Sequence, residues 1–448
     1  MRILDILVLD LRFYLLLTIW VIGCIIFHPF AYAILPVVFV LGHRERYFEV
    51  LILFLFVLIL SDSTDPLLMW SQSFKNILVL TLGVVFVLKY KFFSSGSGII
   101  RYFLPFFVIA IVCLAYSPIP IVGSQKMLSY FLVFIIVPKF VLEAIKIQGR
   151  IVLKRFLVFG LIVLVISLFL GYIGGPDSIG MMANYRLNGV FGNPNGLGIY
   201  VLIFTCFVVA LKEVYTGLIS RVEYLVILGF VLFIVVQTGS RGALMSLIVL
   251  IASNSLFKLS PWIGILVIFF IIAIYDFLLS YFIATMIDLG LQEELRLDKI
   301  EDASGRVIAW TFAWDNIQDS FFLGKGFGYD RNLTRINFMR LSKLGHEGGV
   351  HNSFLMLWLN VGLLGLIAWL RGMFLVTIKG NKNTRVALPI LISVFISAFF
   401  EGWLVGSLNP FTPFFLITLT VLTSKDFINV GSDAAVEKNF ENKTIGAS

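Results

Sequence analysis

Long apolar runs separated by short polar segments fill the chain up to residue 284 and return after residue 350. In lipid, every backbone polar group has to be paired within the protein, so these runs predict helices although they are rich in Phe, Val and Ile. A helix of about 20 residues crosses the hydrocarbon of a bilayer. The predicted spans lie near residues 13–27, 30–42, 47–61, 74–89, 101–117, 127–145, 154–174, 196–212, 223–239, 242–257, 261–284, 352–376, 385–405 and 410–424.

The first two runs are short and are separated only by His28 and Pro29, so they are either two spans or one long kinked helix. The charges of the loops distinguish these alternatives. With two separate runs and a cytoplasmic N-terminus, alternate loops carry most of the cations, and the other loops carry few, chiefly Lys126, Arg186 and Arg241. The positive-inside rule places the cation-rich loops in the cytoplasm, which predicts about fourteen transmembrane helices with both termini cytoplasmic.

This topology places three segments on the outer face: residues 175–195, the corner at 239–241, and the long stretch 286–350. The long stretch is expected to be partly helical, because Ser304 is a suitable N-cap and apolar residues recur at helical spacing near residues 304–318. This amphipathic helix is expected to lie on the membrane surface or on top of the bundle, with the apolar stripe Val307, Trp310, Trp314 and Ile317.

The glycine-rich run 324–328 breaks this helical pattern and is interpreted as a turn, because no strand precedes it as a dinucleotide-binding loop would require. Residues 1–424 are predicted to form a single transmembrane domain. The tail at residues 425–448 is polar and lacks apolar periodicity, so it is predicted to be disordered in the cytoplasm.

The composition supports a membrane protein and excludes soluble enzymes. Hydrophobic residues make up 59% of the chain and charged residues 13%, with a mean hydropathy of +0.99, so too few charges are present to cover a water-facing surface. Because the charges follow the loops, the net charge of +8 does not indicate nucleic-acid binding. The cysteines lie in apolar runs and predict neither a disulfide nor a metal site. The N-terminal run lacks a small-residue cleavage site and is expected to remain as the first span.

Arginines kept beside spans on the outer face are candidate functional residues. Arg186 lies in a loop with Asn193 and Asn195, Arg241 lies at a corner between spans, and Arg306 begins the predicted outer helix. Guanidinium groups bind phosphate oxygens in pairs, and helix N-termini add N–H groups that favour an anion, so this set suits a lipid-linked pyrophosphate. The alternative is that each arginine extends to lipid headgroups or pairs with a loop carboxylate. This alternative is less favoured for Arg241, because its small neighbours let a ligand approach closely.

His351 and Asn352 lie at the outer mouth of the next predicted span. The imidazole could act as a general base near neutral pH, although spacing alone favours a capping or structural role. Glu401 lies near the outer end of a later span, where a carboxylate is costly and is expected to pair with an arginine or to orient His351. His346 and His351 are five residues apart with glycines between them, which does not fit a helical zinc motif, so no metal site is predicted.

A set of motifs occurs in a fixed order along the chain: residues 186–195, residues 238–243, Ser304-Gly305-Arg306 with Trp310, residues 324–328 and His351-Asn352-Ser353. Together they resemble the O-antigen ligase and polymerase superfamily of bacterial envelope glycosyltransferases over roughly the C-terminal two-thirds of the chain. The resemblance implies a GT-C-like membrane fold. It also implies transfer of a glycan from undecaprenyl pyrophosphate to a hydroxyl outside the cytoplasmic membrane, without metal, nucleotide or other cofactor.

The resemblance further implies that Arg241, Arg306 and His351 are the essential catalytic residues. The expected pyrophosphate- or glycan-binding residues are Arg186, Asn193, Asn195, Asn352 and Glu401. The protein is expected in the bacterial inner membrane, in contact with membrane lipids, with its active site on the periplasmic face.

The resemblance leaves the acceptor open. It is a second lipid-linked repeat unit for a polymerase and lipid A-core for a ligase. The many spans and the Asn-Pro-Asn loop favour a polymerase, for which a chain-length regulator is a candidate partner. A transporter of lipid-linked glycans is a third hypothesis, which is less favoured because the candidate residues cluster at the outer end and no inverted repeat is visible.

Overall fold

The computed structural model describes residues 3–90, 98–174, 180–181, 186–260, 264, 288, 306–344, 346 and 348–424. The helices, with η marking 3-10 helices, are α1 (Ile3–Ile26), η1 (His28–Ala33), α2 (Ile34–His43), α3 (Tyr47–Asp62), η2 (Pro66–Leu68), α4 (Trp70–Lys89), α5 (Ile100–Leu114), α6 (Pro120–Gln148), α7 (Ile151–Gly174), α8 (Pro194–Val214), α9 (Arg221–Thr238), α10 (Arg241–Leu259), α14 (Arg306–Gln318), α15 (Tyr329–Ile336), α16 (Phe338–Lys343), α17 (Ser353–Asn383), α18 (Ala387–Phe400), η5 (Trp403–Val405) and α19 (Phe411–Thr423). These residues contain no β-strand, only an isolated antiparallel bridge between Met181 and Leu187.

The described helices are those of a polytopic membrane protein. Seven of them are long and apolar enough to cross a membrane, and five more are apolar but shorter. α3 adds 16 residues that are almost all buried inside the bundle. The predicted all-helical membrane class is therefore confirmed. The predicted span at 261–284, the N-cap Ser304 and the tail at 425–448 lie outside the described residues.

The first two apolar runs form two separate helices. α1 ends at Ile26, η1 turns the chain, and α2 begins at Ile34, which confirms the interpretation as two helices. Gly23 permits the turn, because an added Cβ would lie 2.6 Å from the ring of Phe30. α1 begins well before the expected start at residue 13, because its acidic residue Asp10 is paired inside the bundle and does not end the helix.

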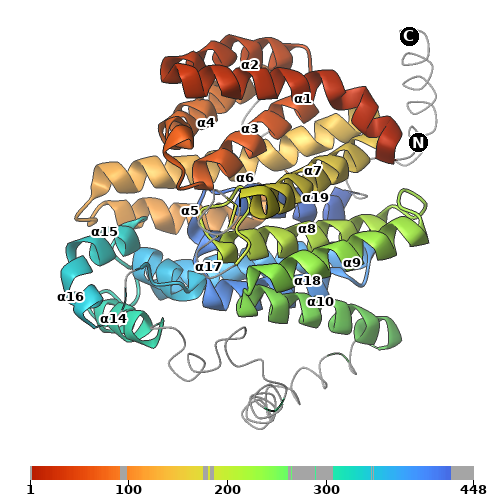
Figure 1. The fold of residues 1–448 in the computed structure, drawn as a ribbon. Helices are drawn as coiled ribbons and strands as arrows, with labels where there is room; N and C mark the ends of the chain where they lie inside the picture. Colours follow the sequence, from red (N-terminus) through yellow and green to blue (C-terminus); the bar gives the residue numbers. More distant parts are fainter. Residues whose placement is uncertain are drawn as a thin grey trace.

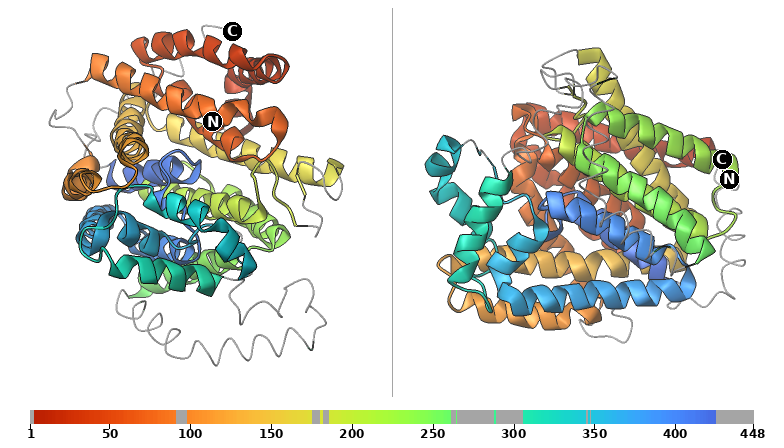
Figure 2. Two further views of the ribbon diagram at one scale, coloured as in Figure 1. Left: turned by 90° about the vertical axis from the view of Figure 1, so that its left-hand side faces the viewer. Right: turned by 90° about the horizontal axis from the view of Figure 1, so that it is seen from below.

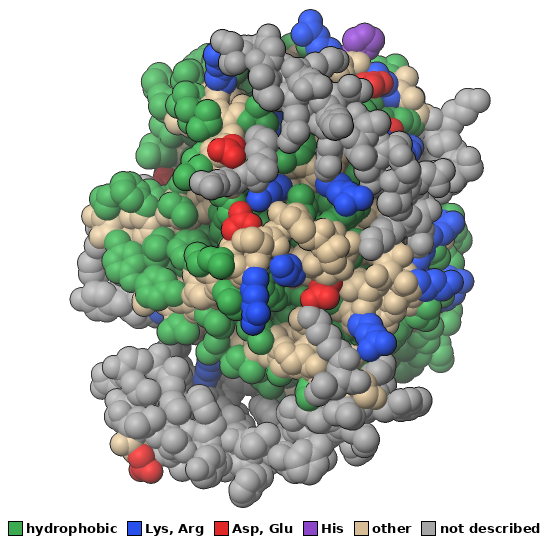
Figure 3. All heavy atoms as spheres, turned by 90° about the vertical axis from the view of Figure 1, so that its right-hand side faces the viewer, with side chains coloured by type: hydrophobic (Ala, Val, Ile, Leu, Met, Phe, Trp, Pro, Cys, Tyr) green, Lys and Arg blue, Asp and Glu red, His purple; other side chains and the backbone are tan. Residues whose placement is uncertain are grey.

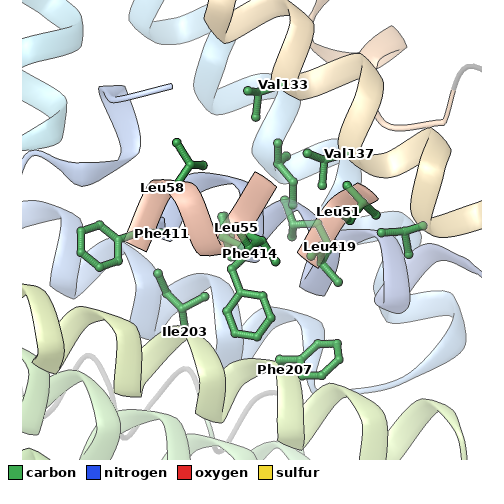
Figure 4. Close-up of a cluster of buried hydrophobic side chains, with 14 of the residues drawn as sticks. Leu51, Leu55, Leu58, Val133, Val137, Ile203, Phe207, Phe411, Phe414 and Leu419 are labelled. Atoms are coloured by element: carbon green, nitrogen blue, oxygen red, sulfur yellow. The ribbon is translucent and has the colours of Figure 1, made fainter. Parts of the chain in front are cut away.

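Four helices, α3, α6, α8 and α19, enclose the main hydrophobic core. Figure 4 shows Leu55 of α3, Val137 of α6, Ile203 of α8 and Phe414 of α19 around a common centre. α8 is buried continuously over residues 196–211. This central helix therefore has a fixed position, and the loop before its N-terminus is held at one end of the bundle.

The start of α1 and the end of α19 lie at the same end of the bundle. Nε of Arg155, in α7, donates to Asp10 Oδ2 in α1 at 2.9 Å. Ser424, after α19, hydrogen-bonds to Tyr215, whose ring lies 5.8 Å from the guanidinium of Arg150. Figure 3 looks onto this end and shows several Lys and Arg side chains on it. This end contains cation-rich loops and corresponds to the face that the sequence predicts to be cytoplasmic.

The helices α14, α15 and α16 lie across the opposite end of the bundle, on the left in Figure 1 and facing the viewer in the left panel of Figure 2. α14 packs on α17 through Ala309, Ala313 and Ile317, which are buried. Of the expected apolar stripe, Ile317 is buried, whereas Val307 is 47% exposed and Trp314 is 41% exposed. Small alanines let the two helix backbones approach, whereas Val307 and Trp314 remain exposed beside the contact.

α17 is interrupted at Gly362, where φ is +68° and ψ is −179°. The glycine run 324–328, a turn as predicted, packs against this break, because an added Cβ at Gly324 would lie 2.5 Å from the backbone nitrogen of Gly362. Two N–H groups of the run donate to the carbonyls of Leu359 and Asn360 at 3.0 and 2.8 Å. Backbone carbonyls that the break removes from the helical pattern are thereby paired inside the protein, as a lipid environment requires.

Gly362→Ala should destabilise the protein by about 2 kcal/mol or more, because of positive φ and steric overlap. An added Cβ would lie 2.2 Å from the backbone of Phe322. Thermal unfolding of the detergent-solubilised protein, followed by tryptophan fluorescence, should show a clearly lower midpoint.

The matched control is Gly229→Ala in α9, where an added Cβ has nothing within 4 Å. In a helix interior this change should be neutral or stabilising by about 0.5–1 kcal/mol. Equal unfolding midpoints for the two variants would contradict the account of the break.

Candidate active site

The carboxylate of Glu401, directly after α18, is the centre of the candidate site. Its Oε1 accepts hydrogen bonds from Arg306 Nη2 at 2.6 Å and from Asn195 Nδ2 at 3.0 Å. Its Oε2 lies 3.1 Å from Nδ1 of His351. The Glu401 side chain is 15% exposed. One partly buried carboxylate therefore contacts Asn195 of α8, Arg306 at the start of α14 and His351, which lies just before α17.

His351 is held in a backbone conformation that is rare for residues other than glycine, with φ at +48°. Asn352 caps α17 by accepting two backbone N–H groups of its first turn, at 2.9 and 3.0 Å. Ser353 Oγ donates to the backbone carbonyl of Glu401 at 2.7 Å. These bonds on the C-terminal side of His351, together with its contact to Glu401, maintain the unusual conformation.

The contact with Glu401 determines which nitrogen of His351 is basic. A carboxylate offers only acceptors, so Nδ1 carries the hydrogen in this contact and the lone pair of the neutral imidazole is on Nε2. Nε2 would lie 2.6 Å from a Cβ added at Gly348, so the missing side chain leaves this nitrogen accessible. The His351 side chain is 37% exposed. An imidazole oriented by a carboxylate, with its other nitrogen accessible, can act as a general base.

Arg306 is the first residue of α14 and is held beside Glu401 by the packing of its helix. Trp310, one turn later, packs edge-on against Phe399 of α18 with ring centroids 5.2 Å apart. The Arg306 side chain is 20% exposed, so its guanidinium is partly open beside the carboxylate. Ser304 and Gly305 of the same motif lie outside the described residues.

Arg186 is bound to the corner between α9 and α10. Its Nε donates to the carbonyl of Thr238 at 2.8 Å, and its Nη2 donates to Asn195 Oδ1 at 3.0 Å. Gly239 has φ +57°, and an added Cβ would lie 3.1 Å from Arg186 Nε. The corner therefore requires glycine, both for its conformation and for the approach of the arginine. Asn195 connects Arg186 to Glu401 through hydrogen bonds.

Arg241 begins α10 and is partly buried. α10 packs along α18, and an added Cβ at Gly242 would lie 3.5 Å from the side chain of Phe400, the residue before Glu401. Arg241 therefore lies at the same end of the bundle as Arg186 and Arg306, next to the end of α18.

The two other predicted asparagines have capping roles. Asn193 Oδ1 accepts the N–H of Gly196 at 2.9 Å and caps α8, with Pro194 in the first helical position. Asn352 caps α17 in the same way. Substrate binding by these residues stays a prediction, and the side-chain oxygens of both are already engaged in caps.

The region around Glu401 is electropositive. α8, α10, α14 and α17 all begin here, and helix N-termini carry partial positive charge. Among the described residues, Arg186, Arg241 and Arg306 add three formal positive charges here, and the carboxylate of Glu401 offsets one of them. Such a combination of cations and helix N-termini favours an anionic ligand.

Sequence analysis did not identify a second group of cations beside this site. Lys75, Lys126 and Arg331 line a cavity whose wall also includes Gly402. Two of these residues carried a signal in the sequence. Lys75 lies within a predicted apolar span, where a lysine is costly and usually has a function, and Lys126 is one of the few cations in the loops predicted to lie outside. The proximity of the three elements that carry these cations is not visible in the sequence.

Residues 225–370 match the family model of the O-antigen ligases. This match confirms the resemblance to the O-antigen ligase and polymerase superfamily. The matched segment contains Arg241, Arg306 and His351, whereas Arg186 and Glu401 lie outside it. No curated protein matches the chain.

The neutral side chain of His351 should carry its hydrogen on Nδ1, because Glu401 accepts it there. Two-bond ¹H–¹⁵N correlation spectra of ¹⁵N-histidine-labelled protein should show a protonated Nδ1 and an unprotonated Nε2, with His351→Gln used to assign the signals. Glu401→Ala, which removes the acceptor, should shift the population toward the Nε2–H form. Predominance of the Nε2–H form in the unaltered protein would be incompatible with the orientation described here.

Proposed function

We propose that the protein is a membrane glycosyltransferase that moves a glycan from undecaprenyl pyrophosphate to a sugar hydroxyl on the outer face of the inner membrane. We propose further that it polymerises repeat units of O-antigen or another surface polysaccharide. The observation that carries the proposal is the joint contact of Arg306 and His351 with Glu401, in an electropositive region where several helices begin. The family match supports the glycosyltransferase class.

The arginines are proposed to neutralise the leaving pyrophosphate. Arg306 and Arg241 lie next to the end of α18, and Arg186 is held nearby through Asn195. Donors that are held in position before the reaction stabilise developing charge without reorganisation at that moment. Arginine is suited to this role because its planar fork can bind two phosphate oxygens at once.

His351 is proposed to take the proton of the attacking hydroxyl on Nε2. The new bond forms between the acceptor oxygen and the anomeric carbon, while the bond from that carbon to the phosphate oxygen breaks. The bonding electrons leave with undecaprenyl pyrophosphate, and Glu401 stabilises the imidazolium. Because Glu401 is engaged by three side chains, it is not proposed as a nucleophile, and the displacement should invert the anomeric configuration. A product that retains the configuration would exclude this mechanism.

A ligase that transfers the glycan to lipid A-core is the second candidate. The specific observation that favours it is the family model itself, which describes O-antigen ligases. Glycan ladders from a deletion strain distinguish the two functions. Single repeats on lipid A-core indicate a lost polymerase, and long glycans that remain on the lipid carrier indicate a lost ligase.

His351→Ala should reduce the transfer rate by about 10²–10⁴-fold, the usual contribution of a general base. Arg306→Lys should reduce it by about 10²-fold or more, because lysine keeps the charge and loses the paired donors. The measurement is the initial rate with purified protein and a defined glycan on undecaprenyl pyrophosphate, with and without chelator.

Arg340→Lys provides a matched control, because Arg340 is exposed on α16 and belongs to no part of the candidate site. This variant should transfer at the rate of the unaltered protein. An unchanged rate in correctly inserted His351→Ala would remove the histidine from the mechanism.

A further inference from the structure

A second electropositive cavity of about 420 Å³ lies next to the candidate active site. Its lining includes Met356 and Gly402, and Gly402 directly follows Glu401. An added Cβ at Gly402 would lie 2.3 Å from the sulfur of Met356, so these two residues are in close contact. The cavity and the Glu401 site therefore share the segment around residues 401–403 as a common wall.

Three cations from three different elements line this cavity: Lys75 of α4, Lys126 of α6 and Arg331 of α15. Within the described part of the chain, none of them has a carboxylate at salt-bridge distance or a side-chain hydrogen-bond partner. The charge of Arg331 is close enough to repel both lysines. Like charges that are brought close together and only partly offset are unfavourable, so an anion in the cavity would stabilise this arrangement.

The nearby acidic groups are already engaged. Asp330 lines the cavity and attracts Lys126, but its carboxylate accepts from Asn360 Nδ2 at 2.9 Å and is 5% exposed. Asp62 attracts Lys75 but lies outside the lining and accepts the N–H of Gly192 at 3.5 Å. These two carboxylates offset two of the three positive charges, so one positive charge remains in excess at the cavity.

Contacts within the protein fix the positions of Arg331 and Lys126. Asn360, fully buried at the break in α17, both accepts the N–H of Asp330 at 3.1 Å and donates to its carboxylate. This anchors the first turn of α15 and with it Arg331. An added Cβ at Gly328 would lie 2.8 Å from Lys126 Nζ, so this glycine leaves the space that the lysine occupies.

We propose that this cavity binds a phosphate or diphosphate group of the acceptor substrate. The proposal rests on the proposed function, in which the arginines around Glu401 take the pyrophosphate of the donor. An acceptor anchored in the cavity would lie across the shared wall from that pyrophosphate, next to the histidine. The oxyanion could be carried by a polyprenyl lipid or by a sugar of the acceptor, and both have the same recognition chemistry.

The test uses the full-length protein in nanodiscs of phosphatidylcholine, with undecaprenyl pyrophosphate and inorganic pyrophosphate as probes. Native mass spectrometry should show two bound copies of a probe for the unaltered protein and one copy for the K75Q/K126Q/R331Q variant. The single variants K126Q and R331Q should each weaken the second binding event by about tenfold in titrations. These changes remove charge at exposed or half-buried positions without adding bulk. The single variants keep the test valid if the triple variant does not fold.

The control is R335Q, because Arg335 lies on the same short helix, is exposed, contacts Asn332 and does not line the cavity. It should bind two copies. If the unaltered protein binds a second copy of inorganic pyrophosphate but not of undecaprenyl pyrophosphate, the oxyanion belongs to a sugar of the acceptor.

The proposal is overturned if the cavity variants bind as many copies of each probe as the unaltered protein and R335Q bind. Failure of the proposed function gives a different result. In that case R186Q/R241Q/R306Q, which removes the arginines around Glu401, would leave probe binding unchanged while the cavity variants still lose one copy.

Discussion

The organisation of the candidate site depends on one carboxylate at the end of a membrane helix. Glu401 accepts hydrogen bonds from Arg306 and Asn195, and its second oxygen contacts His351. These partners come from parts of the chain that are far apart in sequence. A partly buried charge of this kind is stable only with several charge-assisted partners, and the loss of any one would leave others unpaired. The carboxylate therefore fixes at once the position of the arginine and the tautomer of the histidine.

The bundle concentrates its polar interactions at its two ends. At one end Arg155 is buried with Asp10 and Glu49, and this group joins α7 to α1 and α3. At the other end the Glu401 network joins α18 to α8, α14 and α17. Between them lies a continuous apolar core, in which α8 is enclosed by other helices. The polar groups at the ends thus specify which helices are neighbours, whereas the apolar contacts between them are less selective.

The sequence predicts much of the fold and part of the site. Apolar runs identify the helices, and Arg186, Arg241, Arg306 and His351 follow from motifs in a fixed order. The buried face of α14 does not follow, because Ala309 and Ala313 are selected by the close approach of α17 and not by apolar periodicity. The cavity does not follow either. Lys75 and Lys126 lie on different helices, and only the docking of α15 on the broken α17 brings Arg331 to them.

The break in α17 also affects how the protein is made. The carbonyls of Leu359 and Asn360 receive hydrogen bonds from the glycine run 324–328, which precedes α17 in the chain. A newly synthesised α17 therefore cannot satisfy its own backbone when it enters the bilayer. Translation delivers the missing donors first, but they have to dock on α17 while it inserts. Correct insertion of α17 thus depends on the timely docking of the preceding segment as well as on the hydrophobicity of the helix.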